Sequence, residues 1–232
     1  MRDTFANIGL DAAPFRVVNY HNTPAHRASQ YDRELAALAE RYAPTREDDL
    51  AAYFDTGRWP SARSDGRPGI VIALYNGYRN NLDVFRPLLE KHGLVGWFFA
   101  VTGYASCPPD EQAGFAAARN LATIPGEYAD GRHALDWAEL RALDGPHVVA
   151  SHTRSHARID PADAAGQERE IVGAQQDFVR ELGHPVRSFA WLLSGTYGQA
   201  AVTDACLDQA GYEFLFSDFR IQRLPRAATV TN

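Results

Sequence analysis

The sequence predicts an α/β fold in which parallel strands alternate with helices along the chain. Continuous apolar runs, such as residues 69–74, recur along the 232 residues and are typical of strands covered on both faces. Amphipathic segments of helical period lie between these runs, and no internal repeat, low-complexity tract or domain linker interrupts them. Because parallel strands require helical crossovers, this alternation indicates either a barrel or a doubly wound sheet.

The N-terminal part of the chain predicts one strand and two helices. Residues 15–20 predict the strand, and residues 32–42 predict a helix with its apolar side chains on one side. Thr45-Arg-Glu-Asp48 resembles a capping box and predicts a short second helix through Tyr53. Residues 61–68 form a polar connection that contains glycine and proline.

The remainder of the chain predicts the core. Strands are expected at 69–74, 95–101, 148–150, 186–191 and 213–217. Helices are expected at 80–92, 136–143, from Asp160-Pro161 to Gly183, and at 199–210. Residues 106–132 predict a long insertion with a helix near Phe115. We expect a single domain over 1–232, in which residues 1–68 precede a core of residues 69–232.

The composition excludes some classes of partner. The net charge is −6 and no run of lysine or arginine is present, so we expect no nucleic-acid partner. No apolar run approaches the length of a membrane span, and residues 1–10 lack the apolar core of a signal peptide. We therefore expect no membrane association and a cytoplasmic location. Cys107 and Cys206 have no metal-type spacing, and the composition leaves the oligomeric state open.

Polar side chains follow three of the predicted strands. Tyr75-Asn-Gly-Tyr78 follows the first, Ser151-His-Thr-Arg-Ser-His156 follows the third, and Ser194-Gly-Thr-Tyr197 follows the fourth. In parallel α/β folds, ligands bind at the carboxyl ends of the strands. We therefore expect these three segments to converge on one pocket.

His152 and His156 are the strongest candidates for a metal site. If a helix starts at Ser151, the two imidazoles lie on one face and can share a divalent metal. The alternative is that both histidines cap a helix or bond to the backbone. The other histidines have no partner in spacing and are expected to be structural or exposed: His21, His26, His92, His133, His147 and His184.

Other residues near the predicted pocket also have two interpretations. Tyr75-Asn76-Gly77 is either part of a site or an ordinary turn, since Asn-Gly is a common turn pair. Trp191 and Tyr197 are candidates for a wall on which a sugar ring stacks, or for rim packing.

The ordered set of motifs resembles one family. Ser151-His-Thr-Arg-Ser-His156 is identical to the Ser-His-Thr-x-x-His motif of the polysaccharide deacetylases with a NodB-homology domain. The likeness extends over nearly the whole chain, through the following segments: Val18-Asn-Tyr-His21, residues 74–81, residues 84–93, residues 97–103, residues 186–190 with Gly195 and Tyr197, residues 210–217 and Arg223-Leu-Pro-Arg226.

The resemblance implies a distorted (β/α) barrel of the NodB-homology type with seven or so parallel strands. It also implies removal of N- or O-acetyl groups from a carbohydrate by a divalent metal such as zinc, held by one aspartate and two histidines. By this resemblance His152 and His156 are metal ligands. A preceding aspartate is the general base in the family, and a histidine near the C-terminus is the general acid.

This chain departs from the family pattern at the positions that carry the chemistry. Tyr75 stands at the position of the base aspartate, Asn76 at that of the metal-binding aspartate, and Asn80 at a further acidic position. No histidine follows His184, so the general acid has no counterpart. A phenol with an ordinary pKa near about 10 is a poor base at neutral pH, and Asn76 brings no charge to a metal. Metal binding is therefore expected to be weak or absent.

Three hypotheses follow. The first is a divergent metal-dependent deacetylase or amidase, with Tyr75 replacing the base and Asn76 joining the two histidines. The second is a catalytically impaired relative with a binding or regulatory role. It would bind a carbohydrate or another small acetylated molecule in the same cleft, with Tyr78, Trp191 and Tyr197 as its contact surface. The third is a subunit that associates with an active partner. The residues predict weak or absent deacetylase activity.

Overall fold

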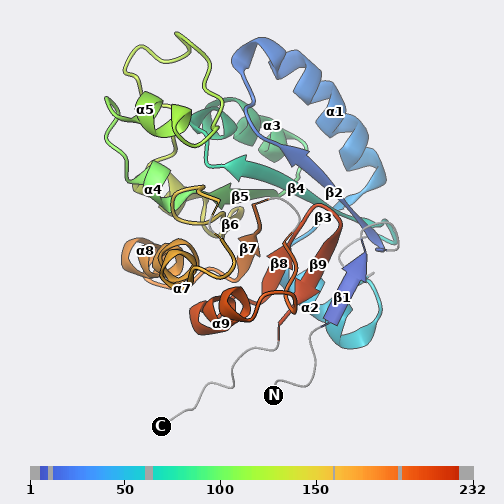
Figure 1. Cartoon of the computed structure of the whole chain (residues 1–232). Helices are drawn as coiled ribbons and strands as arrows, with labels where there is room; N and C mark the ends of the chain where they lie inside the picture. The colour runs from blue at the N-terminus through green and yellow to red at the C-terminus, as the bar shows by residue number, and fades with distance from the viewer. Residues whose placement is uncertain (1–5, 10–12, 61–64, 159, 193–194, 225–232) are drawn as a thin grey trace.

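A curled sheet forms the centre of the computed structural model, which describes residues 6–9, 13–60, 65–158, 160–192 and 195–224. The strand order is β1-β9-β8-β7-β6-β5-β4-β2, and β3 pairs with β4. The strands are β1 (Ala6–Gly9), β2 (Phe15–Tyr20), β3 (Ala43–Pro44), β4 (Gly69–Asn76), β5 (Gly96–Ala100), β6 (Val148–Ser151), β7 (Ser188–Ala190), β8 (Phe214–Phe216) and β9 (Arg220–Arg223). Among the described residues, the seven strands β2 to β8 run parallel, β9 is antiparallel to β8, and β1 is antiparallel to β9. The predicted distorted barrel of about seven parallel strands is confirmed, as an open half-barrel (Figure 1).

Helices fill the crossovers between the strands. They are α1 (Ala28–Arg41), α2 (Glu47–Thr56), α3 (Arg86–Lys91), α4 (Thr102–Ala105), α5 (Gln112–Ala117), α6 (Trp137–Leu143), α7 (Ala164–Gln167), α8 (Gly173–Leu182) and α9 (Ala201–Ala210). A 3₁₀ turn precedes α1 at Ala25–Arg27, and π-helical turns precede α3 at Asn81–Phe85 and α8 at Glu168–Val172. Among the described residues, no helix has the length and apolarity to cross a membrane.

The helix ends follow ordinary capping chemistry, with two corrections. The helix predicted from Asp160-Pro161 begins later, at α7, where the Asp163 carboxylate is the N-cap and accepts the Gly166 N–H at 3.0 Å. The Asp136 carboxylate accepts the Glu139 N–H at 2.8 Å, and the Glu139 carboxylate accepts the Asp136 N–H at 2.9 Å, which is a capping box at the start of α6. The capping box predicted at Thr45 is displaced by one residue. Arg46 is the N-cap of α2, and its N–H donates to the Asp49 carboxylate at 2.8 Å.

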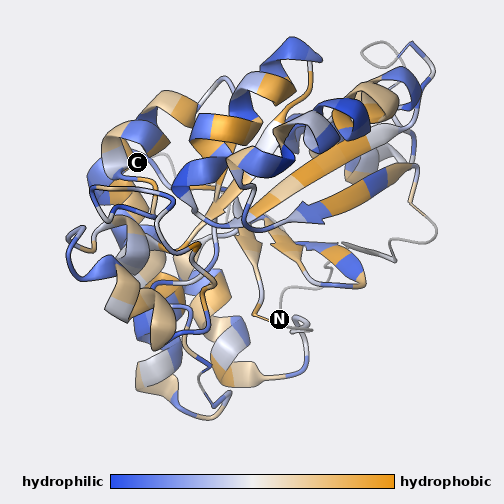
Figure 2. Ribbon diagram, turned by 90° about the horizontal axis from the view of Figure 1, so that it is seen from above, coloured by the Kyte–Doolittle hydropathy of each residue, from blue (hydrophilic) through white to orange (hydrophobic). Residues whose placement is uncertain are grey.

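Both faces of β4 are covered, which explains its continuous apolar sequence. Ile70 and Ile72 pack into the core between the sheet and the outer helices, while Val71 and Ala73 pack into the core on the inner face. Helix α2 covers this inner face through the buried Leu50. Figure 2 shows the same division, with apolar strands in the centre and polar residues on the outer sides of the helices.

The strand register aligns the carboxyl ends that carry the candidate residues. Asn76 at the end of β4 lies beside Ala100 of β5, and Ala100 lies beside Ser151 of β6. Tyr20, at the end of β2, lies beside Leu74 of β4. Residues that follow these strands therefore emerge at one edge of the sheet, where ligands bind in parallel α/β folds.

Candidate functional site

A pocket of about 650 Å³ lies at the carboxyl edge of the sheet. Residues at the ends of β2, β4 and β8, or after β2, β6, β7 and β8, line it, together with a segment after α5. We call it the carboxyl-edge pocket, and its lining residues are Asn19, His21, Tyr75, Ala118, Arg119, Asn120, His152, His156, Ala157, Arg158, Trp191, Leu192, Phe216, Ser217 and Asp218.

The structure brings His152 and His156 together, but not on a helix. Their ring centroids are 5.2 Å apart, and both rings line the carboxyl-edge pocket. The helix considered at Ser151 is wrong, because residues 152–158 form a loop. Thr153 and His156 both have positive φ angles, of 68° and 58°, which turn the chain back on itself. The four-residue spacing thus places the imidazoles side by side through a loop.

Each imidazole is fixed by a backbone carbonyl. Nδ1 of His152 donates to the Ala190 carbonyl at 3.0 Å, and Nδ1 of His156 donates to the Arg119 carbonyl at 3.0 Å. A carbonyl oxygen only accepts, so the proton of each neutral ring is on Nδ1 and Nε2 keeps its lone pair. Burial lowers the pKa of His152 to about 3 and lowers the pKa of His156 as well. Both rings are therefore neutral at pH 7.

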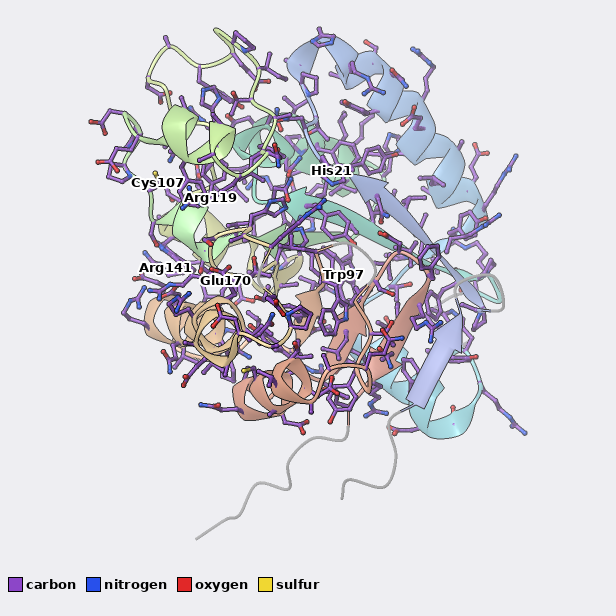
Figure 3. The ribbon with its side chains drawn as sticks, in the orientation of Figure 1. His21, Trp97, Cys107, Arg119, Arg141 and Glu170 are labelled. Carbon is purple, nitrogen blue, oxygen red and sulfur yellow. The ribbon has the colours of Figure 1, made fainter. Side chains whose placement is uncertain are left out.

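Two acidic side chains hold the histidine loop against neighbouring helices. The buried Glu170 carboxylate accepts the Ser155 N–H at 2.7 Å and the Ser155 hydroxyl at 2.6 Å. The buried Asp177 carboxylate of α8 pairs with Arg154 Nε at 3.1 Å. These contacts fix the positive-φ conformation that the loop needs, so Glu170 is a positioning residue (Figure 3).

We expect Glu170→Gln to destabilise the protein by about 1.5 to 3 kcal/mol, the usual value of a hydrogen bond to a charged group. An amide oxygen cannot replace both charged acceptor atoms that Ser155 uses. The free energy of unfolding of each variant, measured by urea denaturation, gives the size of the effect. Glu168→Gln, on the same π-helical turn but exposed, is the matched control. Equal stability of the two variants would contradict the positioning role.

Tyr75 is held in a stack of rings. Its ring lies 5.4 Å from His21 at 27°, 5.1 Å from Phe99 at 16°, and 5.1 Å from His152. Burial, with the nearby charge of Asp218, raises the pKa of Tyr75 above its ordinary value. The phenol is therefore neutral at physiological pH, and its environment opposes the role of general base.

Asn76 lies beneath the pocket rather than in its wall. It is 4% exposed, has a φ angle of 75°, and its Nδ2 donates to the Tyr78 hydroxyl at 3.4 Å. Its Oδ1 is buried and has no hydrogen-bond partner among the described residues. Tyr78 is 2% exposed and packs against Tyr104, so it faces the core and supports Asn76 in place of the predicted ligand contact.

The donor atoms do not match the metal site that the motif resemblance implies. In the part of the chain that the structure describes, no group of three or more His, Cys, Asp or Glu side chains can hold a metal ion. His152 and His156 offer two neutral nitrogens, and the orphaned Asn76 Oδ1 is a neutral oxygen. A divalent cation here would lack the carboxylate that offsets its charge.

Of the two aromatic wall candidates, the structure places one in the pocket. Trp191 lines the carboxyl-edge pocket and packs edge-on against Phe189, with centroids 5.6 Å apart. The Tyr197 hydroxyl donates to the Asp208 carboxylate at 3.0 Å, so this ring is tied to α9 and is not part of the lining. Ser194, in the same predicted segment, lies outside the described residues.

The structure adds pocket residues that the sequence did not single out. His21, expected to be structural or exposed, follows β2 and stacks on Tyr75. Its position after a strand that pairs with β4 was a usable signal. Asp218 follows the strand predicted at 213–217 in the same way. Arg119 comes from the long insertion, and no sequence pattern connected it with the histidine loop.

Comparison with known proteins gives a consistent family and fold. The polysaccharide deacetylase family model matches residues 62–214. The deacetylase PplD of Streptococcus pyogenes, solved with acetate, is 13% identical, with a TM-score of 0.62 over 89% of this chain and 82% of that one. A de-N-acetylase of Aggregatibacter actinomycetemcomitans is 14% identical, with a TM-score of 0.63 over 87% and 86%. IcaB of Ammonifex degensii is 14% identical, with a TM-score of 0.61 over 87% and 82%. Among curated protein sequences there was no significant match.

Proposed function

Since this chain belongs to the polysaccharide deacetylase family, we propose that it binds an acetylated carbohydrate in the carboxyl-edge pocket without hydrolysing it by the family's metal-dependent route. One observation carries the proposal. The positions aligned with the two catalytic aspartates hold Tyr75, a neutral ring in an aromatic stack, and Asn76, a neutral amide beneath the pocket. The fold and the histidine loop are kept, while the charged groups are replaced.

The lining has the mixed character that sugars require. Trp191 and Tyr75 offer aromatic surface for the apolar face of a sugar ring. Asn19, Asn120 and Asp218 offer amide and carboxylate groups for its hydroxyls. The lone pair on Nε2 of His152 or His156 is suited to accept a hydrogen bond from a hydroxyl or an acetamido N–H.

Hydrolysis of an acetyl group needs a base that activates water and a group that stabilises the oxyanion. The raised pKa of Tyr75 leaves it protonated. Asp218 is the single carboxylate among the described lining residues, and it is exposed on the turn after β8. It is thus suited to accept hydrogen bonds from the hydroxyls of a sugar.

A divergent hydrolase is the second candidate, and the histidine pair supports it. Both imidazoles have Nδ1 fixed by a carbonyl, the arrangement in which Nε2 binds a metal. When bound, a metal would supply a Lewis acid for the acetyl carbonyl.

Binding is tested first. We expect calorimetry to detect binding of N-acetylglucosamine oligomers to the unchanged protein. We expect Trp191→Ala to weaken this binding about five- to tenfold, the value of a lost aromatic contact. Phe219→Ala is the control, because Phe219 is 65% exposed close by but is not part of the lining. Equal loss in both variants, or no binding by the unchanged protein, would contradict the proposed function.

Hydrolysis is tested with the same oligomers. We expect no release of acetate above the buffer rate when zinc or cobalt is added, since the base position holds a protonated phenol. A coupled acetate assay measures this. Robust metal-dependent acetate release would favour the second candidate and rule out the first.

A further inference from the structure

The charges that line the carboxyl-edge pocket differ in sign from those of the whole chain. The chain has a net charge of −6. The described lining residues carry two arginines, Arg119 and Arg158, and one carboxylate, Asp218. A positive pocket in a negative protein favours an anionic ligand, because a concave surface concentrates the local field.

Arg119 donates one N–H, from Nη1, to the Phe115 carbonyl at 3.4 Å, which leaves its other guanidinium donors for a ligand. Neither Arg119 nor Arg158 forms an ion pair with any carboxylate in the described parts of the chain, whereas other arginines do. Arg154 pairs with Asp177 at 3.1 Å, and Arg187 pairs with Asp48 at 2.6 Å. A guanidinium that the fold does not use for an internal ion pair is free to bind a carboxylate or a phosphate in a bidentate manner.

The fold also fixes where Arg119 lies. Its guanidinium carbon is 3.9 Å from the centroid of the Phe115 ring, and its carbonyl accepts the Nδ1–H of His156. The backbone of Arg119 is therefore coupled to the histidine loop, which carries Arg158 two residues after His156. Figure 3 shows Arg119 beside α5, on the side of the sheet edge where Glu170 also lies. The two cations thus come from segments that one hydrogen bond joins.

Two carboxylates lie near these arginines, and each comes from another segment of the chain. The Glu170 carboxylate lines an adjoining cavity that shares Arg158 with the carboxyl-edge pocket. Both of its oxygens accept from Ser155, at 2.7 and 2.6 Å. Asp218 comes from the turn after β8, whereas the arginines come from the segment after α5 and from the histidine loop.

We propose that the carbohydrate bound here is acidic, and that Arg119 and Arg158 bind its anionic substituent while the aromatic side chains contact its ring. This inference rests on the proposed function and narrows the substrate class. The anionic group is a carboxylate or a phosphate, since a guanidinium fits either one.

Three sugars that differ only at C6 test the inference by calorimetry at low ionic strength. They are N-acetylglucosamine, its 6-carboxylate and its 6-phosphate. We expect at least one acidic form to bind about tenfold or more tightly than the neutral form, the value of one charged hydrogen-bonded contact. The tighter of the two acidic forms identifies the anionic group. We expect the preference to shrink as salt is added.

Charge-removing variants assign the preference to the two arginines. We expect Arg119→Gln combined with Arg158→Gln to abolish the preference, measured as the ratio of the affinities of this variant for the acidic and the neutral sugar. Arg33→Gln, on the exposed side of α1 away from the pocket lining, is the control with the same kind of charge change. A preference that survives the double variant overturns the assignment of the arginines.

The outcomes separate this inference from the function on which it rests. Equal affinity for neutral and acidic sugars overturns the inference and leaves carbohydrate binding intact. Binding of inorganic phosphate as tight as that of the acidic sugars, without binding of the neutral sugar, overturns carbohydrate recognition and leaves an anion site. Absence of binding by all three sugars overturns both proposals.

Discussion

Replacing Asn76 and Tyr75 by aspartate is expected to raise the affinity for zinc by on the order of a hundredfold or more. Loss of even an outer partner of a metal ligand costs about 10- to 100-fold in affinity, and position 76, which the family fills with an aspartate ligand, holds a neutral amide in this chain. A carboxylate at residue 76 would sit where a neutral, unpaired Oδ1 now lies. It would complete a set of one anion and two imidazoles with His152 and His156.

The backbone favours the change at residue 76 more than the change at residue 75. Asn76 has a φ angle of 75°, a conformation that aspartate tolerates nearly as well as asparagine. Tyr75→Asp removes a ring stacked between His21 and Phe99, and it costs packing. We therefore expect Asn76→Asp alone to keep the fold and to give most of the gain in zinc affinity.

Calorimetric titration with zinc, after treatment with a chelator, measures the gain. A buried carboxylate without its metal is costly, so we also expect zinc to raise the melting temperature of Asn76→Asp more than that of the unchanged protein. Asn120→Asp is the matched control. Asn120 also has a positive φ, of 55°, and lies in the pocket lining away from the aligned position. An equal gain in Asn120→Asp, or no gain in Asn76→Asp, would show that residue 76 does not occupy the family's metal-ligand position.

The strands could be predicted because a strand that is buried on both faces has a continuous apolar sequence. The runs at 69–74 and 95–101 are apolar without alternation, and both proved to be central parallel strands. The helix near Phe115 was also confirmed, as α5. Local signals therefore sufficed for element type, while the position of a cap shifted by one residue, since both Thr45 and Arg46 offer an acidic residue three positions later.

The candidate site was predictable only as far as the residues that follow strands. His152, His156 and Tyr75 line the pocket, as expected from their place after a predicted strand, and so does Trp191, the last residue of the strand predicted at 186–191. The conformation between the two histidines was not predictable, because Thr153 adopts a positive φ that its side chain disfavours and that Glu170, distant in sequence, helps to hold. Tertiary contacts also decide that Tyr197 faces Asp208.

Acid is expected to destabilise this protein well before its carboxylates titrate. Burial lowers the pKa of His152 to about 3, whereas the same side chain in the unfolded chain has a pKa near about 6.5. Between these values the unfolded state binds the proton and the folded state does not, so stability falls as the pH decreases below about 6.5. At pH 5 this costs about 2 kcal/mol from His152 alone. His147 and His156, whose pKa values burial also lowers, act in the same direction.

Some groups act in the opposite direction, so a comparison of variants is needed. The hydrogen bond to Asp144 raises the pKa of His184, which stabilises the folded state as the pH falls. This pair is at the surface, so its contribution to stability is small.

We expect the melting temperature of the unchanged, metal-free protein to fall by about 4 to 8 °C between pH 7 and pH 5. In His152→Gln we expect a smaller fall in melting temperature, because most of the contribution of His152 is removed. In His26→Gln, where the replaced side chain is exposed, we expect the same fall as in the unchanged protein. The quantity to compare is the change in melting temperature of each protein between pH 7 and pH 5. The melting temperature at pH 7 alone is not suitable, because the substitution at His152 also changes packing. A fall of the same size in all three proteins would mean that the His152 imidazole becomes protonated in the folded state, and the neutral ring inferred from its burial would then be wrong.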